Sequence, residues 1–256
     1  MTHAASLPVL LKQLRLSTMA ELWEPMLSKA DAEQWNGAQY LAALCEHEVQ
    51  ERYSRRIARF TKESNLPVGK TLGTFNFDYT PSLKPEKINA LANSTDWVHH
   101  ATNILFFGPS GVGKTHLAAA IAHGLIEKSI RVKYYSATAL VQQMMKARQE
   151  FKLETFFAKL DKYSVILLDD LGYVKKSDQE THVLFELIAH RYETGSLIIT
   201  SNQPFSEWDK IFTDTTMTVA AIDRVVHHSV ILEVKAESYR KRQAISQNII
   251  SSPVPT

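Results

Sequence analysis

The sequence predicts an α/β fold in which a small all-helical domain precedes a core built on a five-stranded parallel sheet. Five short apolar runs, separated by amphipathic helical segments, lie between residues 103 and 233. Unbroken apolar runs, as opposed to alternating ones, are typical of parallel strands that helices cover on both faces. Residues 1 to about 62 instead repeat their apolar side chains at helical spacing.

The composition is that of one α/β domain with a small addition. The chain has 256 residues, enough to bury a full core, and a net charge of +2 that does not by itself indicate nucleic-acid binding. Its single cysteine, Cys45, cannot form an internal disulfide, which favours a reducing compartment. No export signal and no run of about 18 apolar residues is visible, so we expect a cytoplasmic protein that does not bind membranes.

We expect four segments along the chain. These are a helical N-terminal domain over 1–66, a linker arm with a short helix over 67–101, the core over 102–246 and a tail over 247–256. Pro81 and Pro85 predict an irregular arm, followed by a short helix from Ile88. The aromatic side chains between Thr74 and Tyr79 either pack near a nucleotide base or simply dock the arm onto the core, and docking is the more common role.

The third N-terminal helix, expected from about Ala38 to Thr61, carries an apolar stripe and a basic face. The stripe consists of Leu41, Leu44, Val49, Tyr53, Ile57 and Phe60, and Cys45 beside it is expected in the core. The basic face consists of Arg52, Arg55, Arg56 and Arg59. It could contact a DNA backbone, or it could be a solvated face paired with Glu46, Glu48 and Glu51, and the sequence favours neither reading.

In the core, strands and helices alternate in chain order. The expected strands cover 103–107, 131–135, 163–168, 196–200 and 229–233. The expected helices cover 114–128, about 137–148, 152–160 and 182–192, with a short helix that ends at Arg224. This alternation predicts the parallel sheet.

Between the first strand and its helix lies a glycine-rich turn that fits G-x-x-x-x-G-K-[ST], the phosphate-binding loop. Glycines allow backbone N–H groups to curl around an anion, and the helix N-terminus adds positive potential. Lys114 would reach the β- and γ-phosphates, and the Thr115 hydroxyl would bind Mg²⁺. The predicted nucleotide contacts are Gly108, Pro109, Ser110, Gly111, Val112, Gly113, Lys114 and Thr115.

Two carboxylates follow the third strand, at the end where parallel sheets bind ligands. Asp169 is expected to bind Mg²⁺, and Asp170 to orient and polarise the attacking water. An apolar run that ends in Asp-Asp is a weak signal alone. It becomes strong here because one extra strand separates it from the phosphate loop, as in ATPases of the additional-strand class.

Three more polar residues are candidates for the same reaction. Asn202 follows the fourth strand and is our candidate sensor of the γ-phosphate, unless it only starts a turn before Pro204. Arg224 suits an arginine finger presented to a neighbouring subunit, unless it forms a surface pair with Asp223. Arg240 could touch the nucleotide of its own subunit. The ten histidines have no zinc-ligand spacing.

These motifs resemble those of the IstB-like AAA+ ATPases, transposition helper proteins of bacterial insertion sequences that are related to the DnaC helicase loader. The segments that match are 108–117, including His116, then 167–172, 197–205 and 221–224, together with Trp208 and the helical leader around Arg55. The resemblance covers nearly the whole chain. It implies an AAA+ P-loop core that binds ATP and Mg²⁺ at the interfaces of a homo-oligomer, with His116 among the nucleotide contacts.

The resemblance also implies ATP-dependent assembly on double-stranded DNA, recruitment of the element's transposase and disassembly upon ATP hydrolysis. The sequence departs from most AAA+ proteins at Asp170, where glutamate is usual, so hydrolysis is expected to be slow or to depend on a neighbour. Candidate DNA contacts beyond the N-terminal arginines are Lys146, Arg148, Lys152, Lys175 and Lys176, unless these are ordinary surface residues.

Two other functions compete with the transposition helper. A helicase loader would use the N-terminal helices to grip a helicase and would prefer single-stranded DNA. A small-molecule kinase would use the same phosphate loop, but the extra strand, Asn202 and Arg224 argue against it.

Overall fold

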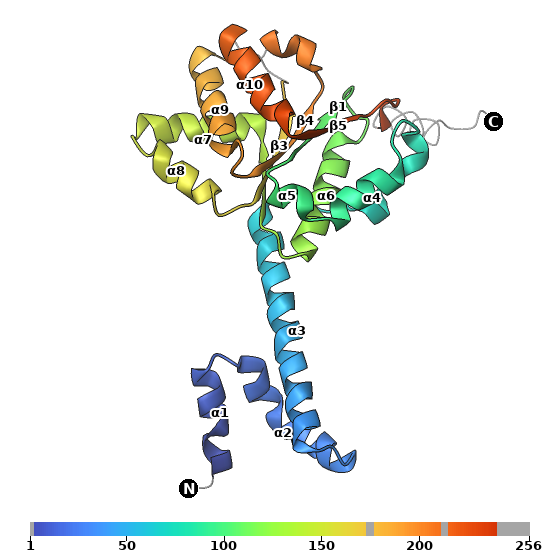
Figure 1. Ribbon diagram of the computed structural model, residues 1–256, viewed down its shortest axis with the longest axis vertical. Helices are drawn as coiled ribbons and strands as arrows, with labels where there is room; N and C mark the ends of the chain where they lie inside the picture. The colour runs from blue at the N-terminus through green and yellow to red at the C-terminus, as the bar shows by residue number, and fades with distance from the viewer. Residues whose placement is uncertain (1–2, 173–176, 211–214, 240–256) are drawn as a thin grey trace, which may run out of the picture. The chain divides into compact units, whose positions relative to one another are not determined.

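The structure, a computed structural model, describes residues 3–172, 177–210 and 215–239 (Figure 1). It contains two compact units, Met1–Arg59 and Phe60–Thr256. The four-segment division made from the sequence, with its first boundary at residue 66, stays a prediction. The candidate site residues Lys175, Lys176 and Arg240 lie outside the described residues.

The first unit is helical and comprises α1 (His3–Gln13), α2 (Ser17–Ala32) and the first part of α3 (Gly37–Ser64). Its small core contains Leu11, Met19 and Leu44. The predicted apolar stripe of α3 is only partly covered, because Leu41 and Val49 are exposed. Cys45 is also exposed, so its expected place in the core is wrong. Helical spacing identifies an apolar face, but it does not say how much of a long helix another element covers.

The second unit is built on a five-stranded parallel sheet, which confirms the predicted fold class. Its strands run in the order β2-β3-β4-β1-β5, so β1, which leads into the phosphate loop, lies between β4 and β5. The strands are β1 (Asn103–Phe107), β2 (Val132–Ser136), β3 (Val165–Leu171), β4 (Ser196–Ser201) and β5 (Ser229–Glu233). All strand pairs are parallel, so the phosphate loop and the end of β3 meet at the same edge.

Helices cover both faces of this sheet, with α7, α9 and α10 on one side and α4 and α6 on the other (Figure 1). The core between sheet and helices includes Leu105, Leu168, Leu187 and the fully buried Trp208. The helices of this unit are α4 (Pro85–Asn93), α5 (Asp96–His99), α6 (Lys114–Glu127), α7 (Ala137–Gln149), α8 (Leu153–Leu160), α9 (Asp178–Arg191) and α10 (Thr215–His227). None of the helices described is both long enough and apolar enough to span a bilayer.

Three element boundaries differ from the sequence prediction. Pro85 does not keep the chain irregular but is the first residue of α4, a position that suits its fixed φ angle. Helix α9 begins at Asp178 because Ser177 and Glu180 form a capping box. Helix α10 continues one turn beyond Arg224. The arm contains two short 3₁₀ turns, η1 (Leu72–Thr74) and η2 (Phe77–Tyr79), and a third, η3 (Phe205–Lys210), follows β4.

Candidate nucleotide-binding site

The loop between β1 and α6 has the backbone of an anion cradle. Gly108 and Gly113 have φ angles of +145° and +98°, which residues other than glycine rarely adopt. Space is also limiting, since a Cβ atom on Gly113 would lie 2.7 Å from the Phe75 ring, and one on Gly108 would overlap the Val234 carbonyl. The sequence folds this way because its glycines stand where the turn requires them.

Lys114, at the start of α6, is the buried cation of this loop. It is only 5% exposed, and its Nζ donates hydrogen bonds of 2.8 Å to the carbonyl oxygens of Gly108 and Pro109. Those contacts hold the ammonium group at the centre of the loop. A charged donor in this position can bind the terminal phosphates of a nucleotide.

The carboxylate of Asp169, at the end of β3, lies directly against the loop. Its Oδ1 accepts hydrogen bonds from Thr115 Oγ1 at 2.8 Å and from Thr200 Oγ1 at 2.6 Å, while Oδ2 accepts one from the Tyr134 hydroxyl at 3.0 Å. Burial, followed by the charge and hydrogen bond of Asp169, raises the pKa of Tyr134, so this phenol remains a donor. Thr115 and Asp169 are oxygen ligands of the kind that Mg²⁺ prefers.

Asp170 follows with its side chain exposed at the edge of the same site. Its φ angle is +58°, and its backbone N–H donates to Thr200 Oγ1 at 2.9 Å. Thr200 on β4 therefore bonds both to the carboxylate of Asp169 and to the backbone of Asp170. The turn that results directs the two consecutive carboxylates to different places, Asp169 inward and Asp170 toward the cavity.

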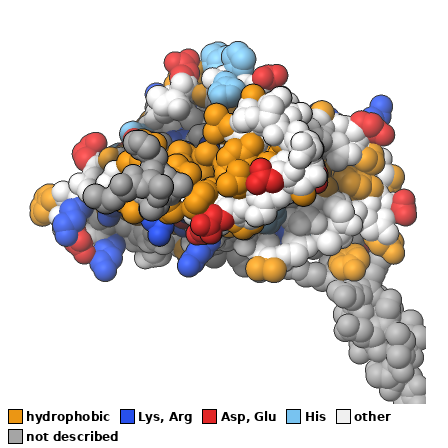
Figure 2. Space-filling model, turned by 90° about the horizontal axis from the view of Figure 1, so that it is seen from below, with side chains coloured by type: hydrophobic (Ala, Val, Ile, Leu, Met, Phe, Trp, Pro, Cys, Tyr) orange, Lys and Arg blue, Asp and Glu red, His pale blue; other side chains and the backbone are white. Residues whose placement is uncertain are grey.

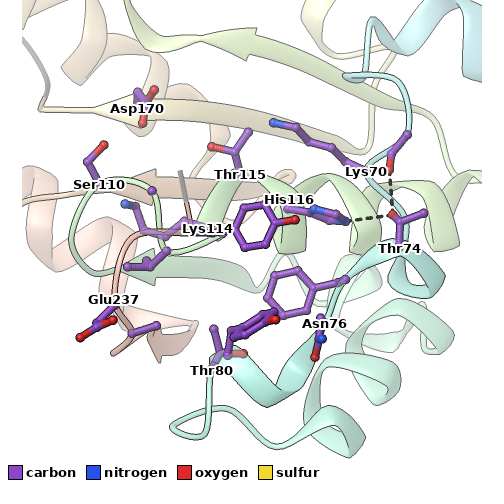
Figure 3. Close-up of a pocket in the computed structure, with 18 residues that line it drawn as sticks. Lys70, Thr74, Asn76, Thr80, Ser110, Lys114, Thr115, His116, Asp170 and Glu237 are labelled. Atoms are coloured by element: carbon purple, nitrogen blue, oxygen red, sulfur yellow. Dashed lines mark hydrogen bonds between the residues drawn. The ribbon is translucent and has the colours of Figure 1, made fainter. Parts of the chain in front are cut away.

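A cavity of about 630 Å³ opens beside the loop (Figure 3). One wall is the loop itself, with Ser110, Lys114 and Thr115, and Asp170 lies at its margin. The opposite wall is the arm, from which Lys70 and Thr74 contribute side chains. A third wall consists of the segment 236–239, which follows β5. Seven of the predicted nucleotide contacts line this cavity, namely Ser110, Gly111, Val112, Gly113, Lys114, Thr115 and His116. Gly108 and Pro109 do not line it, but their carbonyl oxygens accept hydrogen bonds from Lys114.

His116 joins the arm to the first turn of α6. Its Nε2 lies 2.9 Å from the carbonyl oxygen of Thr71 and 3.2 Å from Thr74 Oγ1. The Phe75 ring meets the His116 ring edge to face, with centroids 5.1 Å apart. These contacts dock the arm onto the first turn of α6, and the packing of its aromatic rings near a nucleotide base stays a prediction.

The segment after β5 covers the loop from the other side. The Tyr239 backbone N–H donates to the Gly111 carbonyl oxygen at 3.0 Å, and the rings of Tyr79 and Tyr239 are 6.0 Å apart. Phe75, Tyr79 and Tyr239 therefore give the cavity an aromatic side, opposite the cationic side at Lys114. A ligand with a phosphate chain and a flat ring suits such a cavity.

Two predicted catalytic residues are not brought into this cavity. Asn202 is exposed just beyond the end of β4. The Arg224 guanidinium lies over the Phe185 ring, 5.2 Å from its centroid, and donates to the Ala220 carbonyl oxygen. The roles of both residues stay predictions.

The candidate DNA contacts are partly paired within the fold. On α3, Arg52 bonds to Glu48 at 2.7 Å and Arg55 to Glu51 at 2.8 Å, as in the solvated-face reading. The Arg56 guanidinium lies 6.0 Å from the ring of Tyr53, and Arg59 is exposed on the same helix. In the second unit, Arg148 lies 3.6 Å from Glu186 and Lys152 lies 3.0 Å from Glu150, while Lys146 is exposed. These pairs do not test DNA binding.

Sequence reasoning missed three parts of the site. Tyr134 and Thr200 hold Asp169, and Lys70 lines the cavity. Tyr134 and Thr200 are polar residues near the ends of apolar strands, and that position was a usable signal. Lys70 had none, because only the fold brings the arm against the loop.

A family model and the most similar curated relatives that we compared indicate the same protein family. A family model described as IstB-like ATP binding protein matches residues 9–247. A putative insertion sequence ATP-binding protein of Sinorhizobium fredii is 49% identical over 241 residues, covering 94% of this chain and 81% of the relative. The IS5376 putative ATP-binding protein of Geobacillus stearothermophilus is 38% identical over 231 residues, covering 90% and 92%.

Solved structures show the same fold at lower identity. The crystal structure of the DnaC helicase loader has a TM-score of 0.53 and 22% identity, and the match covers 66% of this chain and 98% of that one. AMPPCP-bound DnaA from Aquifex aeolicus has a TM-score of 0.56 and 18% identity, covering 75% and 58%. The core therefore has the AAA+ P-loop fold.

Proposed function

Because the chain belongs to the IstB-like ATP-binding protein family, we propose that this ATP-binding protein is an Mg²⁺-dependent ATPase that assembles on duplex DNA and recruits the transposase of its insertion sequence. The observation that carries the proposal is the arrangement at the phosphate loop, where Lys114 is held by the Gly108 carbonyl oxygen and Thr115 donates a hydrogen bond to Asp169. ATP hydrolysis would then release the assembly from DNA.

For hydrolysis, each residue has a specific task. Thr115 and Asp169 bind Mg²⁺, which supplies charge neutralisation at the phosphates when it is bound. Lys114 binds the β- and γ-phosphates, and Asp170, whose side chain lines the cavity, orients the attacking water. Asn202 senses the γ-phosphate, and Arg224 acts on the nucleotide of an adjacent subunit. Arg240 contacts the nucleotide of its own subunit.

The aromatic side of the cavity supports adenine binding. Phe75, Tyr79 and Tyr239 offer ring faces and edges where the base of a nucleotide would lie if its phosphates occupied the loop. Stacking on aromatic rings tolerates different bases. This part of the site therefore supports nucleotide binding in general, and the choice of ATP comes from the family.

The hairpin of α7 and α8 supports a DNA contact. Lys146 and Lys152, together with Lys159, line a groove of about 220 Å³ between the two helices. Phe151 at the tip of the hairpin is 99% exposed, and its φ of +56° belongs to the turn that ends α7, in which the Lys152 N–H donates to the Ala147 carbonyl oxygen at 2.7 Å. The groove carries three lysines and Glu150, which pairs with Lys152, so its net charge is positive. Beside an exposed ring, it suits a phosphate backbone and a base. Arg52, Arg55, Arg56, Arg59, Arg148, Lys175 and Lys176 are further candidate contacts.

Two variants test the proposal. Lys114→Ala should abolish ATP hydrolysis and the ATP-dependent part of duplex binding, measured by a coupled phosphate assay and by fluorescence anisotropy. Lys146→Ala with Arg148→Ala should weaken duplex binding and lower its salt dependence by about two charges, with ATP affinity unchanged. ATP-responsive assembly of the Lys114→Ala protein on duplex DNA would refute the proposal.

The helicase-loader alternative rests on the likeness to the DnaC loader, which at 22% identity concerns the fold alone. The same anisotropy assay separates the two functions. A transposition helper should prefer duplex DNA and respond to its transposase, whereas a loader should prefer single strands and bind a replicative helicase.

A further inference from the structure

Two consecutive histidines and a glutamate meet at the edge of the sheet opposite the phosphate loop. His227 ends α10, His228 leads into β5, and Glu193 lies in the turn between α9 and β4. One carboxylate oxygen and one ring nitrogen from each histidine all lie within 4.8 Å of one another, and the three residues are exposed. Histidine and acidic side chains adjoin at one edge of the surface in Figure 2.

We propose that Glu193, His227 and His228 form a binding site for a divalent transition cation of the Zn²⁺ class. Two imidazoles and one carboxylate are a donor set typical of zinc sites that keep an open coordination position. Surface side chains can close the remaining distance by rotation about their χ angles. Mg²⁺ prefers oxygen ligands, so this site is chemically distinct from the one at Thr115 and Asp169.

Tyr192 orients one of the ligands. Its hydroxyl lies 3.0 Å from His227 Nδ1. This contact restrains the His227 ring, as outer-shell partners of zinc ligands commonly do.

A cation here would join two connections that are far apart in the sequence. Glu193 precedes β4 by three residues, and His228 directly precedes β5. These two strands flank β1, the strand that leads into the phosphate loop. The ion would therefore fix the starts of both neighbours of β1, and it should raise the thermal stability of the second unit. The site does not depend on the proposed DNA or ATPase functions.

Titration of the full chain with zinc chloride, in excess Mg²⁺ and without nucleotide, tests the site by calorimetry. His228→Ala and Glu193→Gln should each weaken Zn²⁺ binding by more than about tenfold, and Tyr192→Phe by about tenfold. The matched control is His99→Ala with His100→Ala. That pair is also consecutive and exposed, but it forms no such group among the described residues, so its removal should leave the affinity unchanged.

Two further readouts separate a built site from casual binding by surface histidines. Co²⁺ bound to the wild-type chain should give visible absorption bands that Glu193→Gln abolishes, and Zn²⁺ should raise the melting temperature of the wild type but not of His228→Ala. Equal Zn²⁺ affinity in the wild type, Glu193→Gln and Tyr192→Phe would overturn the proposal. Because all three ligands are exposed, these substitutions should leave the circular dichroism spectrum unchanged.

Discussion

The Asp169 carboxylate is held by hydroxyl groups from three different elements. Thr115 comes from α6, Thr200 from β4 and Tyr134 from β2, and each donates to one of its oxygens. A carboxylate that is only 5% exposed needs such donors, because burying a charged group without hydrogen-bond partners costs free energy. The three hydroxyls keep Asp169 in one orientation and available as a ligand.

Replacement of Tyr134 by phenylalanine should therefore weaken Mg²⁺ binding while leaving nucleotide binding intact. The change removes one hydrogen bond to a charged group, which is worth about 1.5–3 kcal/mol, and it leaves the ring in place. We expect the Mg²⁺ concentration for half-maximal ATP hydrolysis to rise about tenfold. Binding of a fluorescent ATP analogue in EDTA should not change.

Tyr135→Phe is the matched control for this variant. Tyr135 is the next residue of the same strand, so its side chain points to the other face, where it packs against Lys133 and the core. Its replacement should leave the Mg²⁺ dependence unaltered. An unchanged Mg²⁺ requirement in Tyr134→Phe would mean that Thr115 and Thr200 suffice to position Asp169.

Single residues were predictable where a motif fixes their spacing. Ser110 to Thr115 line the cavity and Asp169 accepts a hydrogen bond from Thr115, because the loop and the strand end follow from local patterns, while their roles stay predictions. Tyr134, Thr200 and Lys70 were not predicted, because their contacts join segments that only the sheet order and the path of the arm bring together. Asn202 was predicted to lie at the site but is exposed outside the cavity. Its position after a strand does not determine where its side chain points.

At the scale of helices, Glu48 connects two elements of the N-terminal unit. Its Oε2 accepts hydrogen bonds from the backbone N–H groups of Thr18 and Met19, at 2.8 and 3.1 Å, in the first turn of α2. These N–H groups have no partner within the helix. Glu48, which the sequence presented as a partner of a solvated arginine face, is 4% exposed, and from α3 its carboxylate caps the N-terminal N–H groups of α2.

Glu48→Gln should loosen the packing of α2 on α3. We expect the free energy for opening the amides of α2, measured by hydrogen exchange, to fall by about 1–3 kcal/mol at neutral pH. The exposed pair of Glu51 and Arg55 provides the control, since Glu51→Gln should cost at most about 0.5 kcal/mol. Equal effects of the two changes would contradict the capping role.

The same cap predicts a pH dependence. Burial acts to raise the pKa of Glu48, but hydrogen bonds from Arg52, Met19 and Thr18 outweigh it and hold the pKa below its ordinary value of 4.5. A carboxyl group with a lowered pKa stabilises the fold fully above that ordinary value, and the stability is lost as the pH falls through the pKa of the folded state. Protection of the α2 amides should therefore decrease below about pH 4.5 in the wild type and less steeply in Glu48→Gln.

Element type and order were predicted well, because periodicity and apolar runs are local signals. All five predicted strands are present, and the helices between them match within a few residues apart from the start of α9. The boundaries that differ depend on capping at Ser177 and on Pro85 as a helix start. The sheet order and the exposure of Leu41 depend on tertiary contacts between segments that are distant in the sequence. Local sequence patterns carry no information about such contacts.

For the whole molecule, the described residues around the cavity do not form a complete catalytic site for hydrolysis. Among the described residues, no arginine lines it, and Arg224 lies over Phe185 at 5.2 Å and away from the cavity. A developing charge on the γ-phosphate commonly requires such a cation, which is worth about 10³–10⁵ in rate. Under the proposed function, the missing charge comes from Arg224 of a second copy, so activity belongs to the assembly.

Mixing two inactive variants tests this directly. Arg224→Ala keeps an intact phosphate loop, and Lys114→Ala keeps an intact Arg224, so an interface between them contains one complete site. Each variant alone should lose at least about 10³-fold of the ATPase rate, and an equimolar mixture on duplex DNA should regain a readily measurable fraction of it. A mixture of Lys114→Ala with the double variant Lys114→Ala, Arg224→Ala is the control and should stay inactive. If the first mixture stayed equally inactive, Arg224 would act within its own subunit or not at all, and the proposed interface site would have to be abandoned.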